Sequence, residues 1–187
     1  MKKTVQLITV FSMLWLLAAM DVNAGEKAPQ SVVALAHSQL SQIGTDPIIV
    51  KAVKENNSDG ETLAQVKAMD EKWKATPGIA PFMQDLMNSR CGRHLISIQE
   101  QKPYIVEIFV MDQLGANVAM TDKTSDYWQG DEAKFINSFN GGGAVFVDDV
   151  AFDDSSQAYL VQVSVPVKDG RAVIGAITFG IDLDKLE

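Results

Sequence analysis

An acid and two large aromatic residues stand together at Asp126, Tyr127 and Trp128, in a polar stretch that lacks the periodicity of a core stripe. Tyrosine and tryptophan each offer an apolar face and one hydrogen-bonding tip, which suits the enclosure of a small polar ligand. Asp131 follows at an expected helix start, where free backbone N–H groups could hold a ligand carboxylate. Lys123 is the base next to this segment. The segment is interpreted as a pocket wall; the alternative is that Asp131 only caps a helix and the rings close the domain's edge.

A second set of polar side chains, Gln162 and Ser164, alternates with valines 161, 163 and 165 in an expected strand. Successive side chains of a strand point to opposite faces, so one face is apolar and the other carries polar tips. If the polar face points toward the aromatic segment, Gln162 and Ser164 line the pocket; if it points to solvent, they bind nothing. The period of two does not choose between the faces.

Other residue types that could do chemistry lack the spacing that chemistry needs. The acids at positions 148, 149, 153 and 154 do not fit the twelve-residue calcium loop and are better explained as a solvated turn. His37 and His94 give no metal-ligand spacing. Nucleophile-elbow, phosphate-loop and zinc-protease motifs are all missing from the sequence. We therefore predict a protein that is not an enzyme, with no catalytic residue, no metal site and no cofactor.

The composition narrows the range of partners. The 187 residues carry a formal net charge of −8, and such an acidic chain without a basic run is a poor partner for nucleic acid or anionic lipid. The hydrophobic fraction of 47% is typical of a globular protein. One cysteine, Cys91, cannot form an internal disulfide, so the fold depends on its core, and we expect Cys91 to be buried on a helix.

Residues 1–24 show the three zones of a secretory signal peptide. Lys2 and Lys3 give a basic start, residues 5–20 form an apolar run, and Val22 and Ala24 place small residues where a signal peptidase reads them. The apolar run is short for a stable membrane span, and no second such stretch follows. We expect cleavage after Ala24 and a periplasmic mature protein without a membrane span; an uncleaved membrane anchor is the alternative.

The mature chain changes periodicity near Pro103. Before it, apolar residues recur at helical spacing, which predicts helices over residues 32–43, from Pro47 with Asp46 as its cap, from about Thr62 to about residue 75, and from about 79 to 99. After it, the period of two predicts strands over residues 104–111, 116–121, 144–152, 158–167 and 172–181. A short helix is expected from about Asp131, inside residues 122–139, here called the crossing segment.

The predicted order is two strands, a helical crossing, and three strands joined by short turns. Short turns between consecutive strands force antiparallel pairing. One antiparallel sheet of about five strands with helices stacked on one face is an α+β domain. We divide the chain into a signal peptide at 1–24, a helical N-terminal segment at 25–102 and a sheet domain at 103–187.

Several segments together resemble Cache domains, the extracytoplasmic relatives of PAS sensors. The resemblance covers about residues 104–186, and its ordered pieces are residues 109–119, 124–132, 163–167, 173–177 and 180–182. It implies a PAS-like five-stranded antiparallel sheet preceded by long helices. It also implies a sensor that holds a small metabolite between the sheet and the segment after the first hairpin. The amino-acid-binding subset places an arginine where this chain has Asp126, so amino-acid recognition is not implied.

The resemblance implies a free-standing periplasmic sensor or solute-binding protein, because the sequence shows no second membrane span after the last strand. We expect it to bind a small polar metabolite, such as an organic acid, through Lys123, Asp126, Tyr127, Trp128, Asp131, Gln162 and Ser164. It would report to a partner, such as a membrane-bound signalling protein. The alternatives are an extracytoplasmic protein-interaction module without a ligand, whose docking face is the apolar stripe of residues 32–53, and a hydrolase without a recognisable motif.

Overall fold

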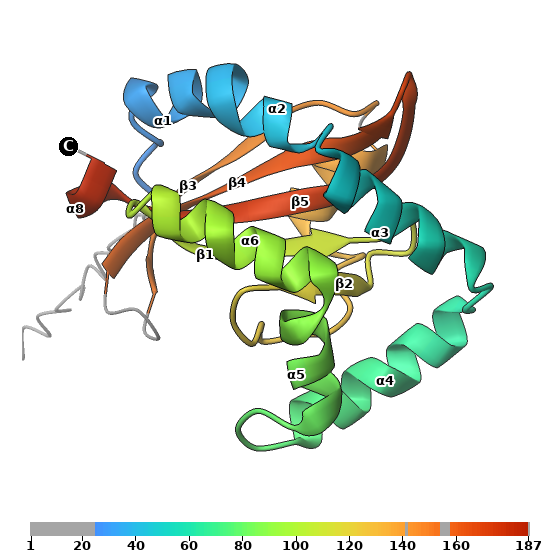
Figure 1. Ribbon diagram of the computed structural model, residues 1–187. Helices are drawn as coiled ribbons and strands as arrows, with labels where there is room; N and C mark the ends of the chain where they lie inside the picture. The colour runs from blue at the N-terminus through green and yellow to red at the C-terminus, as the bar shows by residue number, and fades with distance from the viewer. Residues whose placement is uncertain (1–24, 141, 154–157, 187) are drawn as a thin grey trace, which may run out of the picture.

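A single five-stranded sheet organises the fold (Figure 1), as described by a computed structural model over residues 25–140, 142–153 and 158–186. The strands are β1 Ile105–Met111, β2 Asn117–Met120, β3 Phe146–Asp153, β4 Ala158–Asp169 and β5 Ala172–Asp182. They lie in the order β2-β1-β5-β4-β3, and every neighbouring pair is antiparallel. The predicted α+β class, with a five-stranded antiparallel sheet preceded by helices, is confirmed.

Two of the helices before the sheet begin at polar capping residues close to their predicted starts. In chain order, the helices are α1 Gln30–Leu35, a π-helical turn η1 Ala36–Leu40, α2 Ser41–Ile43, α3 Pro47–Ser58, α4 Leu63–Ala75, α5 Pro81–Asn88 and α6 Arg90–Gln101. The Asp46 carboxylate accepts a hydrogen bond from the backbone N–H of Ile48 at 2.8 Å, directly before Pro47. The Thr62 hydroxyl and the Gln65 side chain form a reciprocal capping box at the start of α4. Short polar side chains therefore set these boundaries.

The prediction of one helix over residues 79–99 is wrong, because the chain turns sharply at Ser89 and forms α5 and α6. Ser89 has an extended backbone (ψ 165°), and its hydroxyl accepts a hydrogen bond from the N–H of Gly92 at 2.9 Å. A Cβ atom on Gly92 would lie 2.2 Å from the carbonyl oxygen of Met87. The missing side chain allows the close approach that the turn requires, and the serine caps the new helix.

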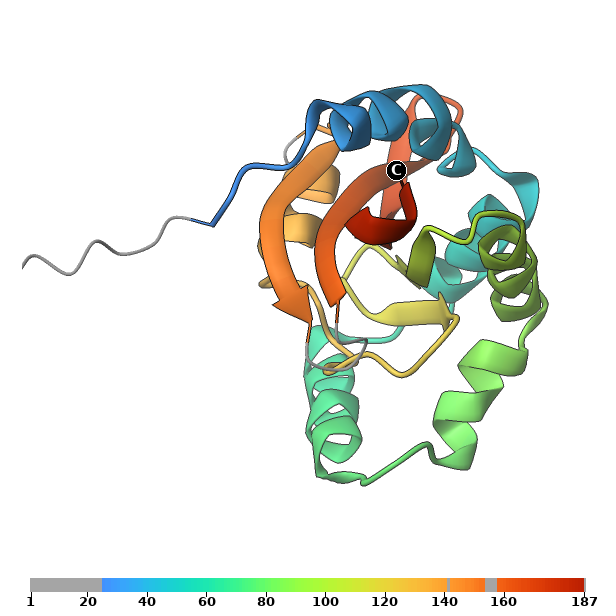
Figure 2. The ribbon, with the colours of Figure 1, turned by 90° about the vertical axis from the view of Figure 1, so that its left-hand side faces the viewer.

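The two faces of the sheet carry different cores. On β4, Val161, Val163 and Val165 pack in a first core with residues of α1, η1, α3 and α6. On the other face, Phe109 joins a second core that contains Trp73 of α4 and residues of the crossing segment. The expectation that helices stack on one face thus holds for α1, α3 and α6. Helix α4 contributes to the opposite face, and Figure 2 shows α4 and α5 extending below the sheet.

The different cores on the two faces of the sheet show which face carries the side chains of Gln162 and Ser164. Because Val161, Val163 and Val165 belong to the helix-covered core, the alternating side chains of Gln162 and Ser164 belong to the face of the crossing segment. The crossing segment carries α7 Ala133–Phe135 and a π-helical turn η2 Ile136–Asn140, and after β5 the chain ends in α8 Leu183–Leu186. The polar tips of β4 therefore lie on the face where a ligand pocket was expected.

Residues of the helical segment and of the sheet share the first core, with Leu40, Ile49 and Leu95 packed against strands β1, β4 and β5. A division of the chain at residue 102 stays a prediction.

In the part of the chain that the structure describes, no helix has the length and apolar character needed to cross a bilayer. The signal peptide at 1–24 lies outside the described residues. Cys91 is buried on α6, as expected, and burial raises the pKa of its thiol to about 12.

Gly44 brings the end of α2 onto β4. Its carbonyl accepts a hydrogen bond from the N–H of Lys168 at 2.9 Å, and a Cβ atom at this position would lie 2.2 Å from the carbonyl oxygen of Pro166. Gly44→Ala should force the helices away from the sheet and lower the free energy of unfolding by about 1 to 3 kcal/mol, as overpacking does elsewhere. Urea denaturation measures this, and Gln42→Ala, at an exposed neighbouring position, is the control. A stability equal to that of the control would contradict the close packing.

Candidate functional site

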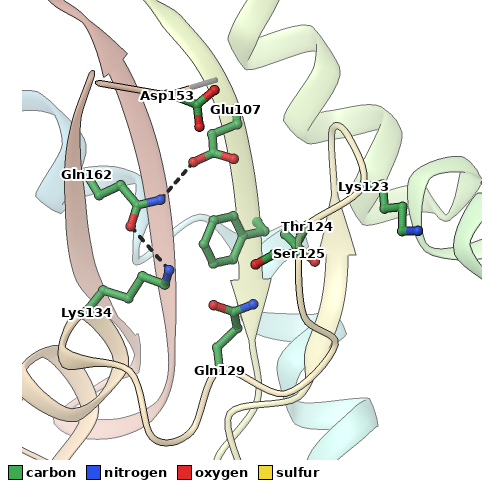
Figure 3. Close-up of a pocket in the computed structure, with 9 residues that line it drawn as sticks. Glu107, Lys123, Thr124, Ser125, Gln129, Lys134, Asp153 and Gln162 are labelled. Carbon is green, nitrogen blue, oxygen red and sulfur yellow. Dashed lines mark hydrogen bonds between the residues drawn. The ribbon is translucent and has the colours of Figure 1, made fainter. Parts of the chain in front are cut away.

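A cavity of about 460 Å³ lies between the crossing segment and the polar face of the sheet (Figure 3). Its volume is within the range of small-molecule sites in proteins. Strands β1, β3 and β4 supply the floor, and the crossing segment supplies the opposite wall. The lining residues are Glu107, Phe109, Lys123, Thr124, Ser125, Gln129, Lys134, Asp153 and Gln162. We call this space the sheet cavity.

The floor of the sheet cavity is a polar row across three strands. Glu107 of β1 and Gln162 of β4 both pair with Gly180 of the intervening β5, and the Gln162 amide donates a hydrogen bond to the Glu107 carboxylate at 3.1 Å. A Cβ atom on Gly180 would lie 2.6 Å from Cγ of Glu107. Because Gly180 has no side chain, the Glu107 carboxyl group can lie over β5 and reach Gln162.

Lys134 extends this polar row from the crossing segment. Its ammonium group donates to the Gln162 amide oxygen at 3.2 Å and lies 5.5 Å from the centre of the Phe109 ring. Gln162 therefore accepts from a cation and donates to an anion at the same time. A chain of two hydrogen bonds, Lys134 to Gln162 to Glu107, fixes three side chains at the cavity surface (Figure 3).

Glu107 is held in an environment that opposes its ionisation. Burial is the main cause that raises the pKa of its carboxyl group, and the nearby negative charge of Asp153 acts in the same direction. The hydrogen bond from Gln162 and the charge of Lys134 lower this pKa, but the net direction is upward. Functional sites often contain a buried carboxyl group with a shifted pKa, although its burial destabilises the folded protein.

The opposite wall is formed around Gln129, whose side chain is 1% exposed. Its amide nitrogen donates to the carbonyl of Asp126 at 2.8 Å, while its amide oxygen is buried without a hydrogen-bond partner. Thr124 also donates to the Asp126 carbonyl, at 2.7 Å. A buried acceptor without a partner costs free energy, so a donor that reached Gln129 would be favoured.

Helix α4 holds this wall in place through hydrogen bonds to its backbone. One oxygen of the Asp70 carboxylate accepts from the N–H groups of Tyr127 and Trp128, at 2.9 and 3.1 Å. The indole N–H of Trp73 donates to the carbonyl of Thr124 at 2.8 Å. The ammonium group of Lys123 donates to two carbonyls at the C-terminal end of α4 and beyond it, those of Thr76 and Gly78. The crossing segment is therefore attached to α4 from residue 123 to residue 128.

The structure divides the residues predicted to form the site. Gln162 and Lys123 line the sheet cavity, although the ammonium of Lys123 points toward the α4 carbonyls (Figure 3). Asp126, Trp128 and Asp131 line a second cavity of about 310 Å³, here called the outer cavity. Its other lining residues are Lys67, Asp70, Glu71, Lys74 and Glu132.

Two predicted residues are buried and line none of the cavities described. Tyr127 is 8% exposed and belongs to the second core, where its ring centre lies 5.6 Å from that of Trp73. Ser164 is fully buried, and its hydroxyl lies 2.6 Å from the hydroxyl of Thr178 on β5. The aromatic wall expected from Tyr127 and Trp128 is supplied in the sheet cavity by Phe109 instead.

The outer cavity is closed by internal ion pairs. Lys74 bridges the carboxylates of Asp70 and Asp126, at 2.7 and 2.8 Å. The ammonium of Lys67 lies 4.4 Å from the centre of the Trp128 ring, whose indole N–H donates to the carbonyl of Leu114. The expected helix starts near Asp131, at Ala133, with Glu132 in the capping position. The chain's own lysines thus already occupy the positions that a cation would take in the outer cavity.

Sequence reasoning missed most of the residues of the sheet cavity. They are Glu107, Phe109, Thr124, Ser125, Gln129, Lys134 and Asp153. One signal was available: Glu107 is the only charged residue in the apolar run of β1. Among the described residues, no group of three or more histidine, cysteine or acidic side chains is arranged to hold a metal ion.

Asp70→Ala should leave two backbone N–H groups of the crossing segment without an acceptor and lower the free energy of unfolding by about 2 to 4 kcal/mol. Asp70→Asn keeps an acceptor oxygen and should cost clearly less. Chemical denaturation of the two variants measures the difference. Equal losses for alanine and asparagine would show that the backbone hydrogen bonds of Asp70 are not what holds the segment.

Glu107→Gln should stabilise the protein at neutral pH. Because the folded-state pKa of Glu107 is raised, the folded protein holds this proton more tightly than the unfolded chain. The wild type therefore loses stability as the pH rises from the unfolded pKa, about 4.5, through the folded pKa, and the variant does not. Melting temperatures should agree below this window, and the variant should melt a few degrees higher above it. A lower melting temperature for the variant at neutral pH would contradict the unfavourable burial.

Comparison with known proteins finds similarity at the level of structure alone. No protein-family model matches the chain, and no curated protein matches it. Its solved structural matches include the sensor domain of the V. cholerae histidine kinase DctB, with 14% identity over 84% of this chain and a TM-score of 0.45. Another is the sensory domain of the Campylobacter jejuni chemoreceptor Tlp3, with 12% identity over 84% of this chain and a TM-score of 0.43. The chain spans 52% and 64% of the length of these two structures.

A third match, the E. coli DcuS sensor domain, has 16% identity and a TM-score of 0.36, and covers 66% of this chain and 90% of that chain. All three are sensor domains, and their likeness to this chain is one of backbone arrangement at TM-scores below 0.5.

Proposed function

We propose that this chain is an exported, periplasmic sensor or solute-binding protein of the Cache type that holds a small polar metabolite in the sheet cavity. The observation that carries the proposal is a cavity of about 460 Å³ whose floor and opposite wall both present polar side chains. The floor residues are fixed by the Lys134–Gln162–Glu107 hydrogen bonds, and the wall is fixed by α4. A preformed site with oriented polar groups is what selective binding of a small molecule requires.

Export to the periplasm is proposed on the signal-peptide pattern of residues 1–24. The role as a sensor is proposed on the cavity itself, which is lined mainly by polar groups that could recognise a small molecule. A sensor must pass its state to another molecule, so we include a signalling partner in the proposal.

The attachment of the crossing segment to α4 offers a path for this coupling. Thr124 and Gln129 line the cavity, and the backbone between them is bonded to Asp70 and Trp73 of α4. A ligand that displaces this wall would displace α4 with it. Helix α4 is therefore the element that we expect to differ between the free and the ligand-bound protein.

The alternative of an interaction module rested on an exposed apolar stripe over residues 32–53. In the structure, Val32, Leu40, Ile49 and Val53 of this stripe have no exposed surface and pack in the first core. These side chains serve the fold, so the ligand-binding proposal is the one that we develop.

The two cavities give matched variants for a binding test. A thermal-shift screen of small metabolites should find a compound that raises the melting temperature, because a ligand of the native state stabilises it. Glu107→Gln and Gln162→Ala, in the sheet cavity, should each lower the affinity for that compound at least about tenfold, because Glu107 is a polar group of the cavity floor and Gln162 holds it in place. Isothermal titration calorimetry measures the change.

Asp131→Ala and Glu71→Ala, at exposed positions of the outer cavity, are the controls and should leave the affinity within a factor of about two, because surface changes away from a site have small effects. The reverse pattern, with affinity lost only in the outer-cavity variants, would move the site to the residues around Trp128. A screen in which both pairs of variants bind as the wild type does would show that neither cavity holds the ligand.

A further inference from the structure

The sheet cavity presents hydrogen-bond acceptors that the chain itself does not use fully. The Glu107 carboxylate accepts from Gln162, and within the described part of the chain this is its only donor. Gln129 contributes an amide oxygen that is buried and has no partner. The two acceptors come from opposite walls, Glu107 from β1 and Gln129 from the crossing segment, and both side chains point toward the cavity (Figure 3).

The orientation of the Gln129 amide follows from its neighbour. One end of the amide lies 2.8 Å from the carbonyl oxygen of Asp126, which can only accept. That end must therefore be the NH₂ group, and the oxygen is the end that has no partner. Rotating the amide by 180° would place two acceptors against each other and would lose the bond to Asp126.

The hydroxyl donors of the cavity are, in contrast, already engaged. The hydroxyl groups of Thr124 and Ser125 donate to the carbonyl and the carboxylate of Asp126, at 2.7 and 2.6 Å. On the floor, the Lys134 ammonium donates to Gln162, and the Gln162 amide donates to Glu107. A ligand acceptor at either hydroxyl group would have to break a hydrogen bond, whereas a ligand donor at Gln129 would satisfy an acceptor that has no partner.

The charges of the lining residues favour the same kind of ligand. Glu107 and Asp153 contribute negative charge, and the positive charge of Lys123 is directed to carbonyl groups of Thr76 and Gly78. Lys134 is the remaining cation among the lining residues, and it is bonded to Gln162. An anionic ligand would therefore meet the Glu107 carboxylate beside a single cation, Lys134, which donates a hydrogen bond to Gln162.

Phe109 adds an aromatic wall that suits a cation. The Lys134 ammonium lies 5.5 Å from the centre of this ring, within the range of cation–π attraction. Glu107 and Phe109 lie two residues apart on β1, so their side chains are on the same face of the strand. A ligand ammonium at the Glu107 carboxylate would have the apolar ring surface beside it for its carbon chain.

We propose that the metabolite of the sheet cavity is a small aliphatic amine with a second donor, such as a diamine or an amino alcohol. Its ammonium group donates to the Glu107 carboxylate, and its second donor group meets the free oxygen of Gln129. This inference rests on the proposed function and sharpens it, and it replaces the organic acid suggested by the sequence with a cationic ligand. The ionic bond supplies most of the affinity, and the Gln129 oxygen distinguishes a two-donor ligand from a simple alkylamine.

Four compounds with the same four-carbon chain test the end groups separately. They are 1,4-diaminobutane, 4-aminobutan-1-ol, succinate and butane-1,4-diol, titrated into the purified protein at neutral pH and constant ionic strength by calorimetry. The diamine and the amino alcohol should bind, and succinate and the diol should give no heat of binding at millimolar concentrations. Binding of succinate or the diol without binding of either amine would overturn the amine assignment while leaving the sheet cavity as a ligand site.

Variants show where the amine binds. Glu107→Gln keeps the shape of the side chain and removes its charge, so the affinity for the diamine should fall at least about tenfold. Gln129→Met removes the acceptor at similar volume and should weaken the diamine several-fold. Asp131→Asn removes one acid from the outer cavity and controls for general attraction of cations to an acidic chain; it should bind as the wild type does.

Three results would overturn the inference. One is diamine binding that survives Glu107→Gln but is lost in Asp131→Asn, which would place the amine in the outer cavity and also count against the sheet cavity as the ligand site. The second is an equal affinity of wild type, Glu107→Gln and Asp131→Asn, which would mean unspecific ion pairing. The third is the absence of binding by both amines at millimolar concentrations. This result would refute the amine assignment, and the metabolite screen would still test the proposed function.

Discussion

The sheet cavity depends on the position of the crossing segment. Backbone hydrogen bonds from Asn117 to Tyr127 and from Gln129 to Gly115 attach this segment to the β1–β2 hairpin, and the buried carboxylate of Asp70 attaches it to α4. One of its oxygens accepts both N–H groups of the Tyr127–Trp128 pair, and its other oxygen accepts from Lys74. A carboxylate that is 4% exposed is retained because each of these donors is charged or belongs to the backbone. With the segment tied to α4, its side chains need not collapse onto the sheet, and space remains above Glu107 and Gln162.

The sheet makes the complementary contribution, because its two faces have different chemistry. The valines of β4 pack under the long helices and supply the burial that the fold requires, and the residues between them are free to be polar. Gly180 then permits a contact across the polar face, from Glu107 over β5 to Gln162. The same alternation thus provides both the core and the recognition surface, and a glycine decides how far the acidic side chain can extend.

Periodicity predicted the sheet well, since all five strands lie within a few residues of their expected ranges. It failed at Ser89, where a single side-chain cap and the close approach at Gly92 divide one apolar stripe into two helices. An apolar stripe reports that residues share a face, and it carries no information on whether the helix axis continues. The caps at Asp46 and Thr62 were predictable because short polar side chains act on the backbone next to them.

The site was harder to predict than the fold, for a reason seen in Tyr127, Trp128 and Glu107. Aromatic residues in a polar segment suggested a pocket wall, but their backbone N–H groups serve as the anchor to Asp70, and the Tyr127 ring completes the second core. Glu107, in contrast, lies inside an apolar strand, where burying a lone charge costs free energy. Which face a strand presents, and which wall a loop forms, depends on contacts between distant segments that a local pattern does not contain.

The most direct measurement is a crystal structure of the protein purified from its native host, with the sheet cavity inspected for bound density. The account predicts density for one small molecule that contacts both the Glu107 carboxylate and the free oxygen of Gln129, with Lys134 still bonded to Gln162. Density confined to the outer cavity beside Trp128, or a sheet cavity closed by the side chains of its own walls, would contradict it.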